Sequence, residues 1–190
     1  MVSTDDAEVA KVAREGGASV PFMRPAHLGK DPYGVVDVCL NVLDEYDKSG
    51  RRFRTLIILL PTSPFRRASD IRAAADLFKN ESASFLMSVS EFGHNPFGAL
   101  KTSPAGQNVM EPCFPEYIGK KRHEVPKTFR VNGAIHIVDV ESFRRANTYY
   151  GKPLFTYEMP WPRDVDIDTE ADLRYAEYLI RTGAIDESDA

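Results

Sequence analysis

The chain has 190 residues, of which 43% are hydrophobic and 27% are charged, and its formal net charge is −4. This composition is typical of a folded globular protein and argues against intrinsic disorder. The length predicts a single domain over residues 1–190. The negative charge excludes a polycationic nucleic-acid-binding protein, but it is compatible with a local site for a small anion.

The cysteines and the first twenty residues predict a cytoplasmic protein with no membrane contact. Cys39 and Cys113 are too few for a disulfide framework, so we expect both to be reduced. The first twenty residues carry acids and no apolar run, so no signal peptide is expected. The longest apolar run, residues 56–60, is too short to cross a membrane.

The first half of the chain predicts alternating helices and strands. Polar capping residues and two glycines predict a helix over residues 3–16. An apolar period of 3.6 predicts a second helix over residues 33–48. Residues 55–60 are continuously apolar, which predicts a buried parallel strand. A third helix is expected from Ser69, followed by a strand over residues 85–89.

The second half continues this alternation after a weakly patterned stretch. Residues 91–127 contain five prolines and predict short strands and long loops over a site. A strand is expected over residues 129–138, a short helix over 140–147 and a strand over 154–159. The last helix is expected over residues 169–181. The fold class is therefore α/β, with a mixed, mostly parallel sheet and helices on both faces. Ligands bind such sheets beyond the carboxyl ends of the strands.

Asp166 and Asp168 form the strongest local signal for chemistry. Two acids separated by one residue point to the same side of an extended chain, while Ile167 points the other way. Mg²⁺ takes one or two protein carboxylates and completes its shell with phosphate and water, so the pair is a candidate magnesium site. The alternative is that Asp168 and Thr169 cap the last helix and that Asp166 is solvated.

Thr62 and Ser63 follow the apolar strand and stand between two prolines. Because proline restricts the backbone, such a loop can hold two hydroxyls rigidly beside a ligand. The alternative interpretation is an ordinary turn.

The strand over residues 129–138 contains the polar dipeptide Asn132-Gly133. A buried amide must find partners, and glycine permits close approach of a ligand or a backbone. A ligand contact and a satisfied core amide are both open. His136 could share the face of Asn132. A basic cluster that includes Arg122 precedes this strand, and it is either an anion site or a solvated charge run.

Taken in order, these segments resemble the acylneuraminate cytidylyltransferases (CMP-sialic acid synthetases) over essentially the whole chain. The segments that carry the resemblance are Ser3-Thr4-Asp5-Asp6, Pro21-Phe22-Met23-Arg24-Pro25, Pro61-Thr62-Ser63-Pro64-Phe65-Arg66, His94-Asn95-Pro96-Phe97, Ala99-Leu100-Lys101, residues 122–126, Arg130-Val131-Asn132-Gly133-Ala134-Ile135 and Val165-Asp166-Ile167-Asp168-Thr169-Glu170. The resemblance implies a Rossmann-like nucleotide-diphospho-sugar transferase fold. It implies an enzyme that joins CTP to a nine-carbon, sialic-acid-like α-keto sugar acid (a nonulosonic acid) and releases pyrophosphate.

The resemblance also implies a role for each candidate residue. Asp166 and Asp168 would hold Mg²⁺ against the triphosphate, and Asp166 is a candidate base. Arg122 would bind the sugar carboxylate, and Arg24 would lie near the nucleotide. The residues expected to line the sugar site or to contact its anion are Thr62, Ser63, Lys101, Asn132, His136 and Arg163.

The sequence departs from the family in three places. The family's first strand and its basic, glycine-containing phosphate loop are absent from it, so we expect that the protein starts upstream or that another chain supplies this part. Leu60 stands where the family usually has glutamine, and His136 stands where it often has tyrosine. The last two departures suggest a nonulosonic acid other than sialic acid, or an altered site.

Two alternative functions follow from these departures. The chain could be an inactive fragment that binds the sugar acid or a full-length homologue but cannot bind CTP. It could also be a glycosyltransferase that uses the two acids for a sugar nucleotide. Family analogy implies a homodimer, for which Phe143, Tyr149 and Tyr150 are candidate contacts that are as readily core residues.

Overall fold

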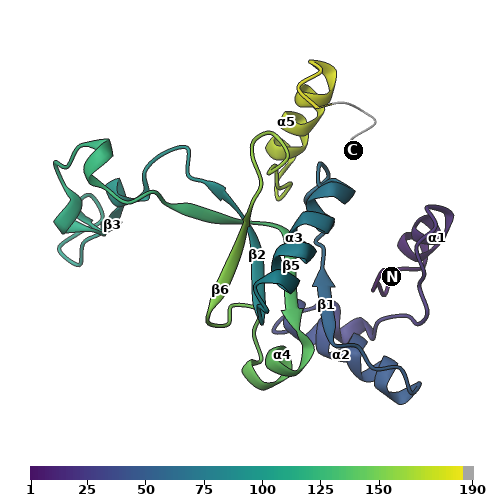
Figure 1. Cartoon of the computed structure of the whole chain (residues 1–190). Helices are drawn as coiled ribbons and strands as arrows, with labels where there is room; N and C mark the ends of the chain where they lie inside the picture. The colour runs from purple at the N-terminus through teal and green to yellow at the C-terminus, as the bar shows by residue number, and fades with distance from the viewer. Residues whose placement is uncertain (186–190) are drawn as a thin grey trace.

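A four-stranded sheet lies at the centre of the computed structural model, which describes residues 1–185 (Figure 1). Across the sheet, the order of strands is β1 (Thr55–Ile58), β5 (Phe129–Asp139), β2 (Phe85–Glu91) and β6 (Leu154–Glu158). β2 and β6 pair in parallel, whereas β5 runs antiparallel to both β1 and β2. Three strands therefore point the same way around one reversed strand, which confirms a mixed, mostly parallel sheet.

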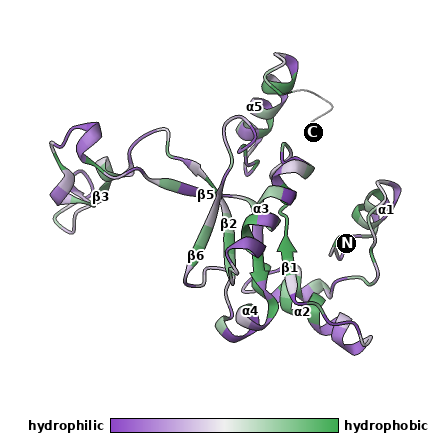
Figure 2. Ribbon diagram, in the orientation of Figure 1, coloured by the Kyte–Doolittle hydropathy of each residue, from purple (hydrophilic) through white to green (hydrophobic). Residues whose placement is uncertain are grey.

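Helices cover both faces of this sheet, as the sequence predicts. The helices are α1 (Ala7–Glu15), α2 (Val35–Lys48), α3 (Ala68–Asn80), α4 (Val140–Ala146) and α5 (Glu170–Arg181). On one face, Phe78 of α3 packs in a core cluster with Leu86. On the other, Leu43 of α2 and Phe143 of α4 pack with Val138. The strands between these layers are the most hydrophobic part of the ribbon (Figure 2).

β1 corrects one expectation, because it is an edge strand that is antiparallel to its partner. β1 pairs only with β5 in the part of the chain that the structure describes, and Ile57 and Leu59 remain 37% and 39% exposed. A continuous apolar run predicts covered faces but carries no information about which strand lies beside it. A cavity of about 530 Å³ runs along this free edge, between β1 and α2. That the family's first strand pairs with this free edge of β1 stays a prediction.

Residues 92–128 form an arm between β2 and β5 (Figure 1). The arm contains the hairpin of β3 (Leu100–Thr102) and β4 (Met110–Pro112) and several short 3₁₀ turns, so the expectation of short strands and long loops is confirmed. That they lie over a site stays a prediction, and within one chain the arm projects away from the sheet. No helix within residues 1–185 is long and apolar enough to cross a membrane.

Candidate active site

The tertiary structure joins the loop after β1 to the acidic segment before α5. The backbone N–H of Ile167 donates to the carbonyl of Thr62 at 2.8 Å. Phe65 from the loop and Val165 from the segment pack in one cluster with Leu179 of α5. Ile167 packs against this cluster, as the alternation of Asp166, Ile167 and Asp168 predicts.

Arg66 ties the same loop to β5. Its Nη1 donates to the carbonyl of Leu60 at 3.1 Å and to the carbonyl of Ala134 at 2.7 Å. Arg66 stands in a segment that sequence analysis singled out, but a role for it was not predicted. An arginine beside a proline-bounded loop is the signal that could have found it, because its fork can satisfy several carbonyls at once.

The two acids of the predicted metal pair line one cavity. Asp166 and Asp168 share a cavity of about 360 Å³ with Asp164, Arg130 and Trp161 among its lining residues. The Oδ1 atom of Asp166 is buried and has no hydrogen-bond partner among residues 1–185. Buried carboxylate oxygens are normally paired, so this oxygen is suited to receive a ligand.

The helix cap and the acid pair are separate features. Thr169 is the N-cap of α5, and its hydroxyl and backbone N–H bond to Asp172 in a capping box. The cap is therefore built from Thr169 and Asp172. The carboxylate of Asp168 is exposed and is not required for it, so the capping interpretation does not account for Asp168.

The donor set at this cavity fits a Mg²⁺ ion held partly by its substrate. Asp166 and Asp168 supply two hard oxygen ligands, one of them carrying the unpartnered buried oxygen. No group of three or more metal-ligating side chains that could hold an ion occurs within residues 1–185. A two-carboxylate site suits Mg²⁺, which keeps its remaining positions for water and phosphate.

Arg130 forms an ion pair with one of the acids that line this cavity. Its Nη2 pairs with Asp164 Oδ2 at 2.8 Å, and Asp164 is only 8% exposed. The pair neutralises the most buried acid of the cavity, whereas Asp166, Asp168 and the capping residue Asp172 line it without an ion pair to Arg130. From the sequence, Arg130 belonged to a segment that carries the family resemblance, but no role was predicted for it.

Asn132 is a satisfied core amide in this structure. It is 1% exposed, its Oδ1 accepts from Ser88 Oγ at 2.5 Å, and its Nδ2 donates to Ser90 Oγ at 2.9 Å. Of the two interpretations left open by the sequence, the geometry favours the structural one. A contact between Asn132 and a sugar stays a prediction.

Gly133 lies at an irregularity of β5 and directly beside the acid pair. The register between β2 and β5 shifts between Met87 and Val89, and Gly133 has a φ of +74°. A Cβ at this position would lie 3.4 Å from Asp166 Oδ2. The glycine therefore allows β5 to bulge and to approach Asp166 closely.

Gly133→Ala is expected to destabilise the fold by about 1–2 kcal/mol, because a left-handed conformation is strained for any residue with a Cβ. Urea unfolding measures this. Gly50→Ala is the matched control, since Gly50 has a φ of +78° but nothing lies within 4 Å of the place that its Cβ would take. We expect both variants to lose similar stability, while only the change at Gly133 also lowers turnover. Equal turnover in both would contradict the proximity of Gly133 to the site.

His136 is buried on the face of the sheet that α2 and α4 cover. It is 4% exposed, its ring centroid lies 4.8 Å from that of Tyr149, and its Nδ1 has no hydrogen-bond partner. Burial lowers the pKa of His136 to about 4, so its imidazole is neutral at neutral pH. The bulge at Gly133 lies between His136 and Asn132, so strand alternation does not carry from one to the other.

The buried imidazole predicts a loss of stability in mild acid. The unfolded chain binds this proton near pH 6.5 and the folded chain near pH 4, so the unfolded state holds more protons between these values. The free energy of unfolding therefore falls as the pH drops from 6.5 to 4, by roughly 3 kcal/mol from this residue. Urea titrations across this range should show a shallower slope in His136→Gln, and an unchanged slope would contradict the assignment.

Thr62 and Ser63 lie in the loop that contacts the acidic segment. The carbonyl of Thr62 is used by Ile167, and Ser63 is 3% exposed with a hydroxyl oxygen that has no hydrogen-bond partner. The loop is thus positioned by tertiary contacts rather than by turn chemistry alone. Contacts between these hydroxyls and a sugar stay a prediction.

Arg24 lines the cavity along the free edge of β1, apart from the acid pair. Its guanidinium forms an ion pair with Asp5, and its backbone N–H donates to the carbonyl of Thr4 at 2.9 Å. These bonds hold the segment before α1 against the segment before α2.

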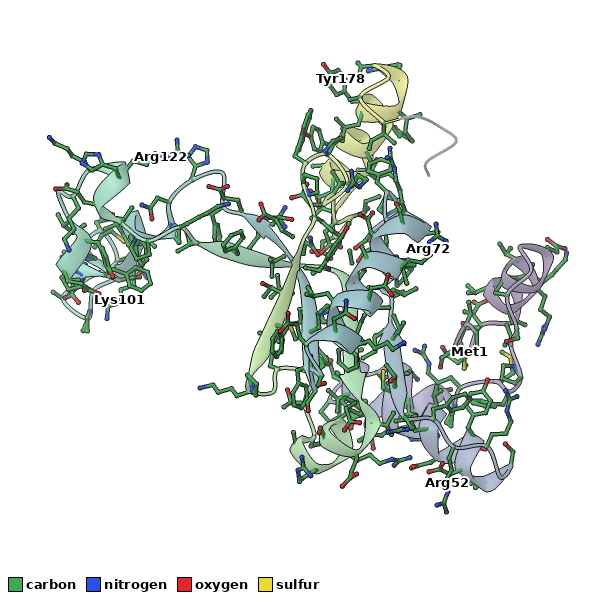
Figure 3. All side chains as sticks on the ribbon, in the orientation of Figure 1. Met1, Arg52, Arg72, Lys101, Arg122 and Tyr178 are labelled. Atoms are coloured by element: carbon green, nitrogen blue, oxygen red, sulfur yellow. The ribbon has the colours of Figure 1, made fainter. Side chains whose placement is uncertain are left out.

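Lys101 and Arg122 lie on the arm, away from the sheet and from α5 (Figure 3). Lys101 is an exposed residue of β3. Arg122 lines a cavity of about 440 Å³ together with His94 and Lys120. Within one chain, the structure does not bring these two residues together with Asp166.

Arg163 is bound to an acid of the protein itself. Its Nε and Nη2 donate to the carboxylate of Asp70 at 3.2 and 3.0 Å. An anion contact of Arg163 with substrate stays a prediction, and this ion pair weighs against it. At this position the sequence predicted only the start of the third helix, because nothing local links Asp70 to a residue 93 positions away.

Comparisons with known proteins place this arrangement in a family. A CMP-N,N'-diacetyllegionaminic acid synthase of Legionella pneumophila is 30% identical to the chain over 183 residues, which cover 95% of this chain and 77% of that protein. The chain belongs to the acylneuraminate cytidylyltransferase family. An N-acylneuraminate cytidylyltransferase of Streptococcus agalactiae is 25% identical over 172 residues, covering 90% of the chain and 40% of that protein.

A solved structure supports the fold of this acylneuraminate cytidylyltransferase family member. The structure of CMP:2-keto-3-deoxy-manno-octonic acid synthetase complexed with CTP matches with a TM-score of 0.65 and 14% identity, over 96% of this chain and 80% of that one. No family model matches the chain. The resemblance read from the motifs is thus confirmed by relatives aligned along nearly the whole sequence.

Proposed function

We propose that the protein joins CTP to a nonulosonic α-keto sugar acid and releases pyrophosphate. The observation that carries this proposal is the cavity lined by Asp166 and Asp168, set beside Gly133 and the loop of Thr62, in a chain of this family. The relatives are synthases and cytidylyltransferases, so they favour an enzyme over an inactive sugar-binding fragment.

In the proposed reaction, the anomeric hydroxyl of the sugar acid attacks the α-phosphorus of CTP. The new bond joins the sugar oxygen to phosphorus, and the bond from phosphorus to the pyrophosphate oxygen breaks. We assign the hydroxyl proton to the carboxylate of Asp166, the candidate base that the resemblance implies. Arg130 holds Asp164, and Asp172 is bound in the helix cap with Thr169, which leaves the carboxylates of Asp166 and Asp168 available to a ligand of the cavity.

We further propose that Mg²⁺ binds at Asp166 and Asp168. When bound there, it would neutralise charge on the triphosphate. The chain contributes two carboxylates from an extended segment, and Ile167 anchors that segment through its bond to Thr62. Burial of Asp166 Oδ1 supports this assignment because an unpaired buried carboxylate oxygen is otherwise unfavourable.

The position of the arm supports a homodimer whose active sites are completed by the second copy. Lys101 and Arg122 lie on the arm, away from the sheet and from α5 (Figure 3). The arm also exposes Leu100, Met110 and Ile118 at 58%, 52% and 56%, and such clustered apolar exposure is typical of interfaces. Phe143, considered as a contact from the sequence, is 0% exposed and belongs to the core. The arm is the better candidate for the interface.

Co-expression of two inactive variants tests the homodimer and the shared site together. Arg122→Ala and Asp166→Asn, each inactive alone, should regain about a quarter of wild-type turnover when mixed dimers form, because half of the dimers then hold one intact site. No recovery in dimers that do mix would contradict a shared site. Sedimentation that shows only monomers would contradict the dimer.

Pyrophosphate release from CTP, Mg²⁺ and a panel of nonulosonic acids tests the reaction itself. Release that depends on both CTP and the sugar acid is the expected result. Binding of a sugar acid by calorimetry, with no CTP binding and no turnover, would instead favour the inactive fragment.

A further inference from the structure

Asp70 is a buried carboxylate that lies outside the proposed reaction. It sits in the first turn of α3 and is 1% exposed. Four donors surround it: Arg163 Nε at 3.2 Å, Arg163 Nη2 at 3.0 Å, the Tyr157 hydroxyl at 3.0 Å and the Arg67 backbone N–H at 3.0 Å. Three elements therefore meet at one side chain: α3, β6 and the loop before α5.

The ion pair between Asp70 and Arg163 is a strong one. Burial alone would raise the pKa of Asp70, but the hydrogen bonds from Arg163, Arg67 and Tyr157 outweigh burial and keep that pKa below its ordinary value. Asp70 is therefore ionised, and the paired fork of Arg163 is the geometry that arginine offers to a carboxylate. Breaking one half would leave a buried charge without its partner.

The ion pair is continuous along the chain with the proposed active site. Arg163 is fixed to α3, and the next residue, Asp164, is fixed to Arg130 of β5 at 2.8 Å. Consecutive residues are thus anchored to two different elements. Three residues further on, the N–H of Ile167 is anchored to the carbonyl of Thr62 at 2.8 Å. Asp166 lies between these anchors.

We propose that Asp70 and Arg163 are positioning residues that hold Asp166 and Asp168 in the geometry the reaction needs. The role of the acid pair rests on the proposed function, whereas the mechanical link rests on the contacts alone. Without the ion pair, the acidic segment keeps its bond to Arg130 but loses its attachment to α3. The segment then opens more often, and Asp166 spends less time beside Gly133.

Amide hydrogen exchange at Ile167 tests the mechanical link without any ligand. In Asp70→Asn and in Arg163→Lys, we expect exchange of this amide to be at least roughly tenfold faster, since a hydrogen bond to a charged group contributes on the order of a tenfold change or more. The strand amides of β5 should keep their protection. Arg144→Lys is the matched control, because Arg144 also pairs with two carboxylate oxygens, those of Asp44 and Asp47, but far along the chain from the site.

The outcomes of the exchange experiment are distinct. Faster exchange at Ile167 alone supports the proposal. Unchanged exchange at Ile167 in both variants overturns it, and so does an equal increase in the whole of β5, which would mean general destabilisation. If Asp70→Asn does not fold, Arg163→Lys still tests the positioning role. This variant keeps a positive charge beside Asp70, so Asp70 is not left as a buried charge without a partner.

Binding of Mn²⁺ in the presence of CTP tests the consequence for the acid pair. Loss of a residue that orients metal ligands weakens metal affinity by about tenfold or more. We expect this in Asp70→Asn and in Arg163→Lys, with little further loss in the double variant because both act through one contact. If the unaltered protein binds no Mn²⁺, the proposed metal site fails, while the exchange of Ile167 still decides the positioning role. Mn²⁺ affinity unchanged in variants whose Ile167 exchanges faster would overturn the link to the acid pair.

Discussion

Asp166→Asn is expected to lower the rate of pyrophosphate release by about 100-fold or more. The substitution keeps the shape of the side chain but removes a negative charge and a proton acceptor from the cavity, and electrostatic groups of this kind contribute on that scale. The measurement is turnover at saturating CTP and sugar acid. Because Asp166 Oδ1 makes no hydrogen bond with any residue of 1–185, the described structure loses no bond at that atom.

The matched control for this change is Asp44→Asn. Asp44 is an exposed acid of α2 whose partner is Arg144, so its replacement alters a surface ion pair of small energetic value. We expect wild-type turnover in this variant. Turnover of Asp166→Asn within a few fold of the control would show that the acid pair does not take part in the reaction.

Phe143→Ala is expected to have the largest effect on stability, about 3–5 kcal/mol of the free energy of unfolding. Phe143 is 0% exposed and packs with Leu43 and Val138 between α4, α2 and the sheet, so the change removes a full aromatic ring and leaves a cavity. Urea denaturation at several protein concentrations measures the effect.

Concentration dependence separates the two interpretations that the sequence left open for Phe143. A core residue lowers the stability of each chain at every protein concentration, whereas an interface residue mainly shifts the dimer equilibrium. Tyr150→Ala is the comparison, because Tyr150 is 54% exposed. A loss below about 1 kcal/mol in Phe143→Ala would contradict its place in the core.

Local patterns in the sequence were sufficient for most helices and strands. The helix after Thr169 begins where the sequence predicts it, and the apolar period of α2 predicts a helix that the structure has over Val35–Lys48. These features are local because capping and helical periodicity involve residues within one or two turns. The alternation at Ile167 likewise placed Asp166 and Asp168 at one cavity.

The order of the strands in the sheet could not be predicted from local patterns in the sequence. The apolar run at β1 predicted a buried parallel strand, but β5 follows β2 in the chain and inserts between β1 and β2 in reverse direction. Hydrophobicity records whether a strand is covered and not which strand lies beside it.

By itself, the sequence determined the fold class, the family and the two acids that carry the proposed chemistry, because each depends on residue types at short spacing. Only the tertiary structure decided that Asn132 bonds to Ser88 and Ser90, and that Asp70 binds Arg163. It also decided that Lys101 and Arg122 lie on an arm that projects away from the sheet and from α5. These outcomes depend on contacts between residues far apart in the chain, and such contacts are fixed when whole elements pack to bury apolar surface and to pair buried polar groups.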